Sequence, residues 1–142
     1  DGKLYDIDDL VRADTAGCGG CSACCHGVGE LVYLNPFDVF SIRKATGLTF
    51  DALLSDMLVL RPNGKLLQPH LGMHGESEAC RFLSTEGRCT IHEHRPSICR
   101  LFPLGRVYDD QRDFKYILLK DACVKPKLDK IKLSKWINID DY

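Results

Sequence analysis

Residues 18–25, with the sequence CGGCSACC, hold four of the eight cysteines of the chain in one short segment. Two intervening residues let the backbone curl so that successive sulfurs converge on one centre. Gly19, Gly20 and Ala23 between the thiols keep bulk out of that turn. The segment therefore predicts a loop whose cysteines bind a metal ion or a cluster.

The other four cysteines are spread through the second half of the chain, at Cys80, Cys89, Cys99 and Cys123. Eight thiols could also pair as disulfides, in 105 ways. Disulfide frameworks serve mostly small, loop-rich secreted domains, whereas clustered free thiols in a reducing compartment usually hold metal. The arrangement favours ligation, and all eight cysteines are candidate ligands.

Length and composition predict one globular domain over residues 1–142, with a metal core at 18–123 and a tail or helix at 124–142. The formal charge is −1, from 19 basic and 20 acidic side chains, so no nucleic-acid partner is predicted. No apolar run approaches the roughly 20 residues that a bilayer requires, so no membrane partner is predicted and a cytoplasmic location is expected.

Local signals predict an α+β fold, a small domain of short helices and a β-hairpin wrapped around a polycysteine metal site, with little core beyond it. Asn35-Pro36 predicts the start of a helix that Gly47 ends near Thr46, and Thr49 caps a second helix through Leu58. The remaining expected elements are a helical turn at 8–12, a turn at 61–64, a strand at 65–71, a hairpin at 79–91 that presents two cysteines, a helical turn at 92–100, a strand at 114–119 and an amphipathic helix or docked segment at 125–137.

Thiolate ligands favour zinc, iron–sulfur clusters or copper(I) and exclude calcium and magnesium. Cys18, Cys21 and Cys24 repeat the spacing of bacterial ferredoxins, in which a distant fourth thiolate completes the cluster. Cys99 or Cys123 could supply that ligand, which makes iron the favoured metal and four-cysteine zinc the alternative.

A second site is expected around Cys25, because adjacent cysteines rarely aim both sulfurs at one metal. Cys80, Cys89 and one remaining cysteine would complete it. A further alternative is that one or two cysteines, such as Cys123 or Cys25, are buried thiols that bind no metal.

His92 and His94 flank Glu93 but lack the four-residue spacing of a metalloprotease helix, so that class is rejected. Each histidine is expected at the surface or beside the site, where it could replace a thiolate or donate to a sulfur. No catalytic residue is identified, because nothing in the spacing singles out a cysteine paired with a base.

The chain resembles the CxxCxxCC family of small bacterial and archaeal proteins, described as zinc- or iron-chelating domains or iron–sulfur oxidoreductases. The resemblance rests on the cysteines of 18–25, on residues 80–83, 89–96 and 99–103, and on Cys123. Where the family commonly has an aromatic residue before Glu93, this chain has His92. The cysteine domain of flagellin lysine N-methylases is also similar.

The resemblance implies an iron- or iron–sulfur-binding protein with a redox or electron-transfer role and a protein redox partner; an enzyme of this kind would be an iron–sulfur oxidoreductase. Two alternatives stay open. One is a zinc-chelating structural or protein-interaction module. The other is an accessory or relative of a protein lysine methylase, although no glycine-rich loop for S-adenosylmethionine is present in the sequence.

Overall fold

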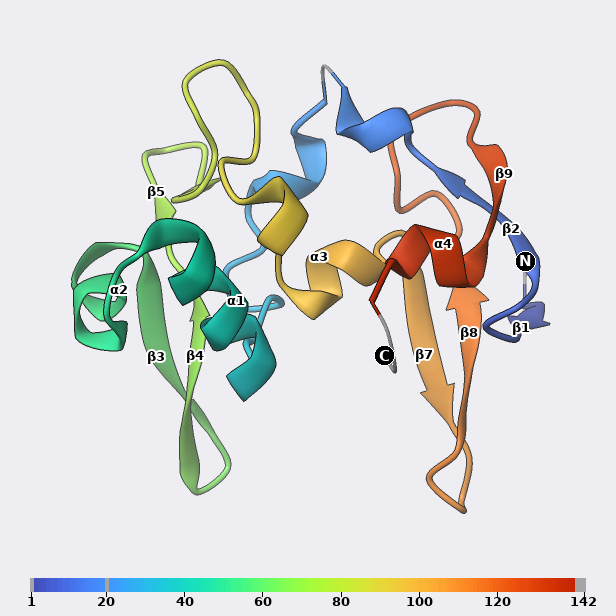
Figure 1. Cartoon of the computed structure of the whole chain (residues 1–142), viewed down its shortest axis with the longest axis horizontal. Coiled ribbons are helices and arrows are strands. Elements are labelled where there is room, and N and C mark those ends of the chain that lie inside the picture. Colours follow the sequence, from blue (N-terminus) through green and yellow to red (C-terminus); the bar gives the residue numbers. More distant parts are fainter. Residues whose placement is uncertain (1, 20, 140–142) are drawn as a thin grey trace. The chain divides into compact units, whose positions relative to one another are not determined.

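The computed structural model describes residues 2–19 and 21–139, and the chain divides into two compact units (Figure 1). The terminal unit consists of Asp1–Gly19 and Arg100–Tyr142, and the central unit of Gly20–Cys99. The prediction that both belong to a single domain stays a prediction. The described residues include three short 3-10 helices, at Ala16–Cys18 (η1), Ala23–Cys25 (η2) and His92–His94 (η3).

Two helices of the central unit begin and end where the sequence predicts, with one exception. At the start of α1 (Pro36–Thr46), the Asn35 side chain accepts a hydrogen bond from the Asp38 amide at 2.8 Å. Gly47 ends this helix in the left-handed region of backbone conformation, with φ 70°. In α2 (Phe50–Asp56) the Thr49 hydroxyl accepts from the Ala52 amide at 3.2 Å. This helix ends at Asp56 and not at Leu58, because Leu58 begins the next strand.

The central unit contains a hairpin of which the sequence predicted only the second strand. β3 (Leu58–Asn63) pairs antiparallel with β4 (Leu66–Leu71), so that Leu58 lies opposite Leu71 (Figure 1). The predicted turn at 61–64 is displaced, because residues 61–63 are the end of β3. Backbone bonds from Leu34 N to Pro69 O (2.8 Å) and from Leu71 N to Val32 O (3.2 Å) attach residues 32–34 to β4.

The hairpin predicted at 79–91 is confirmed only beside its turn, where the Thr90 amide donates a hydrogen bond to the Phe82 carbonyl at 2.8 Å, whereas Cys80 pairs elsewhere. Cys80 lies in β6 (Ala79–Cys80), which pairs with β5 (Met73–His74), while Cys89 forms an isolated bridge with Leu83. The turn between the two cysteines does lie where expected, since the Gly87 amide donates to the Ser84 carbonyl at 3.0 Å. Cys80 therefore lies in a short strand, and Cys89 lies after the turn, opposite Leu83.

The helical turns predicted near Pro96 are confirmed as η3 and α3 (Ser97–Leu101). The boundary between the two units falls within α3, after Cys99. Cys99 is thus the last residue of the central unit.

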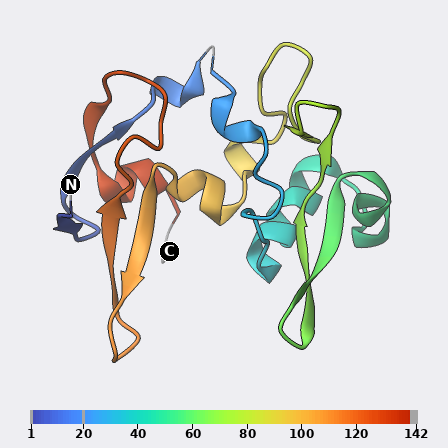
Figure 2. The ribbon, with the colours of Figure 1, turned by 180° about the vertical axis from the view of Figure 1, so that it is seen from behind.

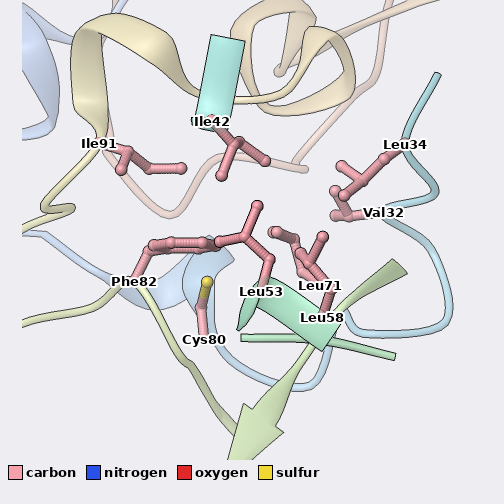
Figure 3. Packing of buried hydrophobic residues seen from close by; sticks show 9 residues of the cluster. All are labelled: Val32, Leu34, Ile42, Leu53, Leu58, Leu71, Cys80, Phe82 and Ile91. Carbon is pink, nitrogen blue, oxygen red and sulfur yellow. The ribbon is translucent and has the colours of Figure 1, made fainter. Parts of the chain in front are cut away.

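The central unit has a substantial apolar core, in contrast to the expectation of little core beyond the metal site. Figure 3 shows the Cys80 side chain among the apolar side chains of this core. Its buried members are Val32, Leu34, Ile42, Leu53, Leu58, Leu71, Cys80, Phe82 and Ile91.

The described part of the terminal unit contains two small antiparallel sheets together with η1 and a short C-terminal helix (Figure 2). β8 (Phe114–Leu118) lies between β1 (Leu4–Tyr5) and β7 (Leu104–Tyr108), which confirms the strand predicted at 114–119. β2 (Leu10–Asp14) pairs with β9 (Asp129–Lys132), and α4 (Leu133–Ile137) follows.

Two predictions for this unit need correction. Residues 8–12 are not helical, because Val11 and Ala13 are buried while Leu10 and Arg12 are exposed, the alternation of a half-buried strand. The amphipathic helix predicted at 125–137 is helical only over α4, since residues 129–132 pair with β2. The buried members of the hydrophobic core of this unit are Tyr5, Val11, Ala13, Leu101, Leu104, Tyr116, Leu133 and Ile137.

Among the described residues, none of the helices combines the length and the apolar character needed to span a bilayer.

Candidate metal centre

The eight cysteines divide between the two units. Cys18 and Cys123 belong to the terminal unit, and the other six belong to the central unit. None of these eight described cysteines forms a disulfide bond. The six of the central unit are Cys21, Cys24 and Cys25 around η2, Cys80 in β6, Cys89 at the bridge to Leu83, and Cys99 in α3.

Four thiols of the central unit gather at its apolar core, and we call them the thiol cluster: Cys25, Cys80, Cys89 and Cys99. Cys80 is itself a core residue with 7% of its surface exposed, and the other three pack against that core. Cys80 and Cys89 also act electrostatically on the other two thiols, raising the pKa of both. The structure thus brings together cysteines from the CGGCSACC loop, from a strand, from a loop arm and from a helix.

Cys24 is adjacent in sequence to Cys25 of the thiol cluster, but its pKa is lowered, whereas that of Cys25 is raised. The Cys25 thiol donates a hydrogen bond to the Cys24 sulfur, which lowers the pKa of Cys24 to about 6 against the opposing effect of burial. The positive charge of Arg95 acts in the same direction as the hydrogen bond. The same bond raises the pKa of Cys25 far above its ordinary value, so one proton is held between the two adjacent sulfurs.

Burial favours the protonated form of two cluster thiols, Cys99 and Cys80, when no metal is bound. Burial is the main reason that the pKa of Cys99 rises to about 12, with the negative charges of Cys80 and Cys89 adding to it. Burial likewise raises the pKa of Cys80. Because a metal binds thiolates, metal binding at these positions would release protons.

The structure gathers the thiols without forming a complete coordination site. Within residues 2–19 and 21–139, no three His, Cys, Asp or Glu side chains stand in an arrangement that would hold a metal ion. In the terminal unit, Cys18 Sγ lies 3.2 Å from Thr15 Oγ1. The ligand roles predicted for Cys18, Cys21, Cys24 and Cys123 stay predictions.

The two histidines next to Glu93 lie in η3 and are half-buried. Arg95 Nη1 lies 3.1 Å from His92 Nε2 and donates to the His92 carbonyl at 2.9 Å. The Arg95 side chain thus reaches back to His92 while its charge acts on Cys24 and Cys99.

Two buried polar residues that the sequence patterns did not single out, Asp38 and Ser97, are joined at the start of the helix that carries Cys99. The Asp38 carboxylate is buried and accepts hydrogen bonds from Ser97, which begins the helix of Cys99. The local sequence accounts for Asp38 only as an acidic residue in the first turn of α1. A serine directly after a proline at a helix start was the available signal for Ser97.

One family model matches the chain, over residues 17–124: the CxxCxxCC family, described as "Putative zinc- or iron-chelating domain". No curated protein and no solved structure matches it. The match covers more than half of the chain and includes all eight cysteines. The chain belongs to the CxxCxxCC family, and this membership supports metal binding through its cysteines, with zinc and iron equally open.

Proposed function

We propose that this member of the CxxCxxCC family binds one zinc or iron ion through the thiol cluster of Cys25, Cys80, Cys89 and Cys99. The observation that carries the proposal is the convergence of thiols from four separate elements on one apolar core. Ordinary packing does not require that residue type at every one of these positions, whereas a four-thiolate site does.

The donor set fits these two metals. Four sulfurs without a carboxylate suit zinc or iron and exclude calcium and magnesium. The half-buried positions of Cys25, Cys89 and Cys99 also limit the access of water to a bound ion. The residues therefore suit a closed site that contributes folding free energy, as in structural four-cysteine zinc sites.

The role of the centre depends on the metal. Zinc would make it a structural element of the central unit, because zinc has no redox chemistry. Iron would make it a one-electron centre whose potential depends on burial and on nearby charge such as that of Arg95. An iron–sulfur cluster on Cys18, Cys21, Cys24 and Cys99, with a protein redox partner, is the alternative that the loop spacing supports. No specific observation favours the methylase relationship.

The test is the content of zinc, iron and acid-labile sulfide per chain, in protein purified without oxygen and without added metal. One zinc or one iron per chain without sulfide, lost in Cys89→Ala and retained in Cys123→Ala, is the expected result. Iron with an equal amount of sulfide would overturn the single-ion site in favour of a cluster. Protein that holds no metal, and takes up none when zinc or ferrous iron is supplied, would contradict both.

A further inference from the structure

We infer that Asp38 is a positioning residue for the metal centre, because its buried carboxylate holds the start of the helix that carries Cys99. This inference rests on the proposed function. It assigns a role to a group that is remote in sequence from every cysteine of the cluster and that supplies no metal ligand itself.

The two oxygens of the Asp38 carboxylate have different partners. Oδ2 accepts from the Asn35 amide at 3.0 Å and completes the cap of α1. Oδ1 accepts from the Ser97 amide at 2.8 Å and from the Ser97 hydroxyl at 2.6 Å. One carboxylate therefore joins the start of α1 to the start of α3, across 59 residues of chain.

Capping alone does not account for this burial. Asp38 has only 2% of its surface exposed, and removing a carboxylate from water costs several kcal/mol unless hydrogen bonds compensate. A capping carboxylate at an exposed helix start meets no such cost. The bonds to Ser97 supply the compensation, and they also restrain the backbone of Ser97 in one place.

Fixing the backbone of Ser97 also fixes the position of Cys99, two residues later in the same helix. Ser97 is the first residue of α3 and Cys99 is the third, so a fixed Ser97 amide sets the position from which the cysteine side chain starts. Pro96 and Ser97 are both buried, which limits other placements of this segment. Groups that orient a ligand in this way typically change metal affinity by 10- to 100-fold when they are removed.

The experiment titrates the metal-free full chain with Co²⁺, whose thiolate charge-transfer and d–d bands report sulfur ligation and its geometry. Asp38→Ala is expected to weaken Co²⁺ binding by about tenfold or more and to change the d–d bands. The matched control is Asn35→Ala, which removes the other half of the same cap but leaves the bonds to Ser97. It is expected to lower the free energy of unfolding by about 1 kcal/mol. Its Co²⁺ affinity should stay within roughly threefold of wild type, and its d–d bands should be unchanged.

A second pair of variants keeps the test decisive if Asp38→Ala does not fold. Ser97→Ala retains the amide donor but loses the hydroxyl, so a several-fold loss of Co²⁺ affinity is expected, and Ser97→Thr should restore it. The inference is overturned if Ser97→Ala binds Co²⁺ with the affinity and spectrum of Asn35→Ala. Wild-type protein that shows no thiolate charge-transfer band with Co²⁺ would overturn the proposed function together with this inference. Failure of the inference alone is therefore distinguishable, because wild type would still show that band.

Discussion

The two units differ in what lies at their cores. The central unit has Cys80 among its buried residues and three more thiols packed against them. In the terminal unit, the described residues of the hydrophobic core are aliphatic and aromatic, with Val11, Ala13, Leu133 and Ile137 almost completely enclosed. A core of hydrocarbon side chains is stabilised by burial alone and offers no ligand to a metal. A core bordered by four thiols can gain further folding free energy when a metal binds to them.

This contrast predicts that the central unit depends on metal and the terminal unit does not. Protonated thiols pack as small apolar groups and add little specific structure. Thiolates bound to one ion would tie η2, β6, the loop at Cys89 and α3 together. Each pair of variants below places one change in each unit.

The largest effect is expected from loss of a cluster thiol. Cys80→Ala should abolish metal binding and lower the stability of the metal-loaded central unit by more than about 5 kcal/mol, because the folding energy supplied by the metal is lost with it. Cys123→Ala, in the terminal unit and outside its buried core, should cost less than about 1 kcal/mol. Metal analysis and urea unfolding would measure both. Equal metal loss in the two variants would remove the distinction between the units.

A cavity made by substitution in either core should lower the free energy of unfolding by a similar amount. Only the cavity in the central unit should also weaken metal binding. Leu53 and Leu133 are both fully enclosed, one in each unit, so Leu53→Ala and Leu133→Ala should each cost about 2–5 kcal/mol. Only Leu53→Ala should also weaken metal binding, since it loosens the core beneath Cys80. Hydrogen exchange and a Co²⁺ titration test this, and weaker binding in Leu133→Ala alone would contradict it.

A pair of glycines tests close packing in the same way. A Cβ at Gly72 would lie 2.7 Å from the Met57 carbonyl oxygen, so Gly72→Ala should cost about 1–3 kcal/mol. A Cβ at Gly105 in β7 would meet only side-chain atoms, the nearest at 3.5 Å, so Gly105→Ala should be neutral or slightly stabilising. Thermal unfolding compares the two, and a Gly72→Ala protein as stable as wild type would mean that the backbones at Gly72 and Met57 do not lie in this close contact.

The smallest expected effect is a pH dependence of the metal-free protein. The pKa of Cys99 is raised in the folded state to about 12, so folding favours the protonated thiol. Its stabilising contribution is complete below the ordinary pKa near 9 and is lost as pH rises toward 12. The opposite contribution of Cys24, whose pKa is lowered to about 6, is nearly complete by pH 9.

Between pH 9 and 11, wild type should therefore lose roughly 1 to 2 kcal/mol more than Cys99→Ala does. Urea unfolding of both metal-free proteins at each pH measures the difference. A wild-type loss no larger than that of Cys99→Ala would mean that Cys99 is not held as a buried thiol.

Local signals predicted the helices of the central unit well, because their determinants lie within a few residues of each end. Asn35, Pro36 and Gly47 bound α1, and Thr49 begins α2. Burial was harder to predict. The apolar Phe40 of α1 is exposed, whereas the acidic Asp38 on the same helix is buried with its distant partner Ser97.

Non-local pairing accounts for the strands that the sequence did not reveal. β2 is a strand because residues 129–132 lie beside it, and β3 contains a proline that argues against a strand by local rules. Cys80 likewise pairs with Met73 and not with the far arm of its own loop. Spacing could identify the cysteines as candidate ligands, but which of them meet depends on these long-range contacts.

Hydrogen exchange of the metal-loaded protein, with and without a chelator that removes the metal, tests the central claim most directly. The account predicts a large loss of protection at the backbone amides of Leu34, Leu71 and Thr90, which hold the central unit together. Little change is expected in β2, β7 and β8 of the terminal unit. Equal loss in both units, or no loss next to the thiol cluster, would contradict a metal centre built on the core of the central unit.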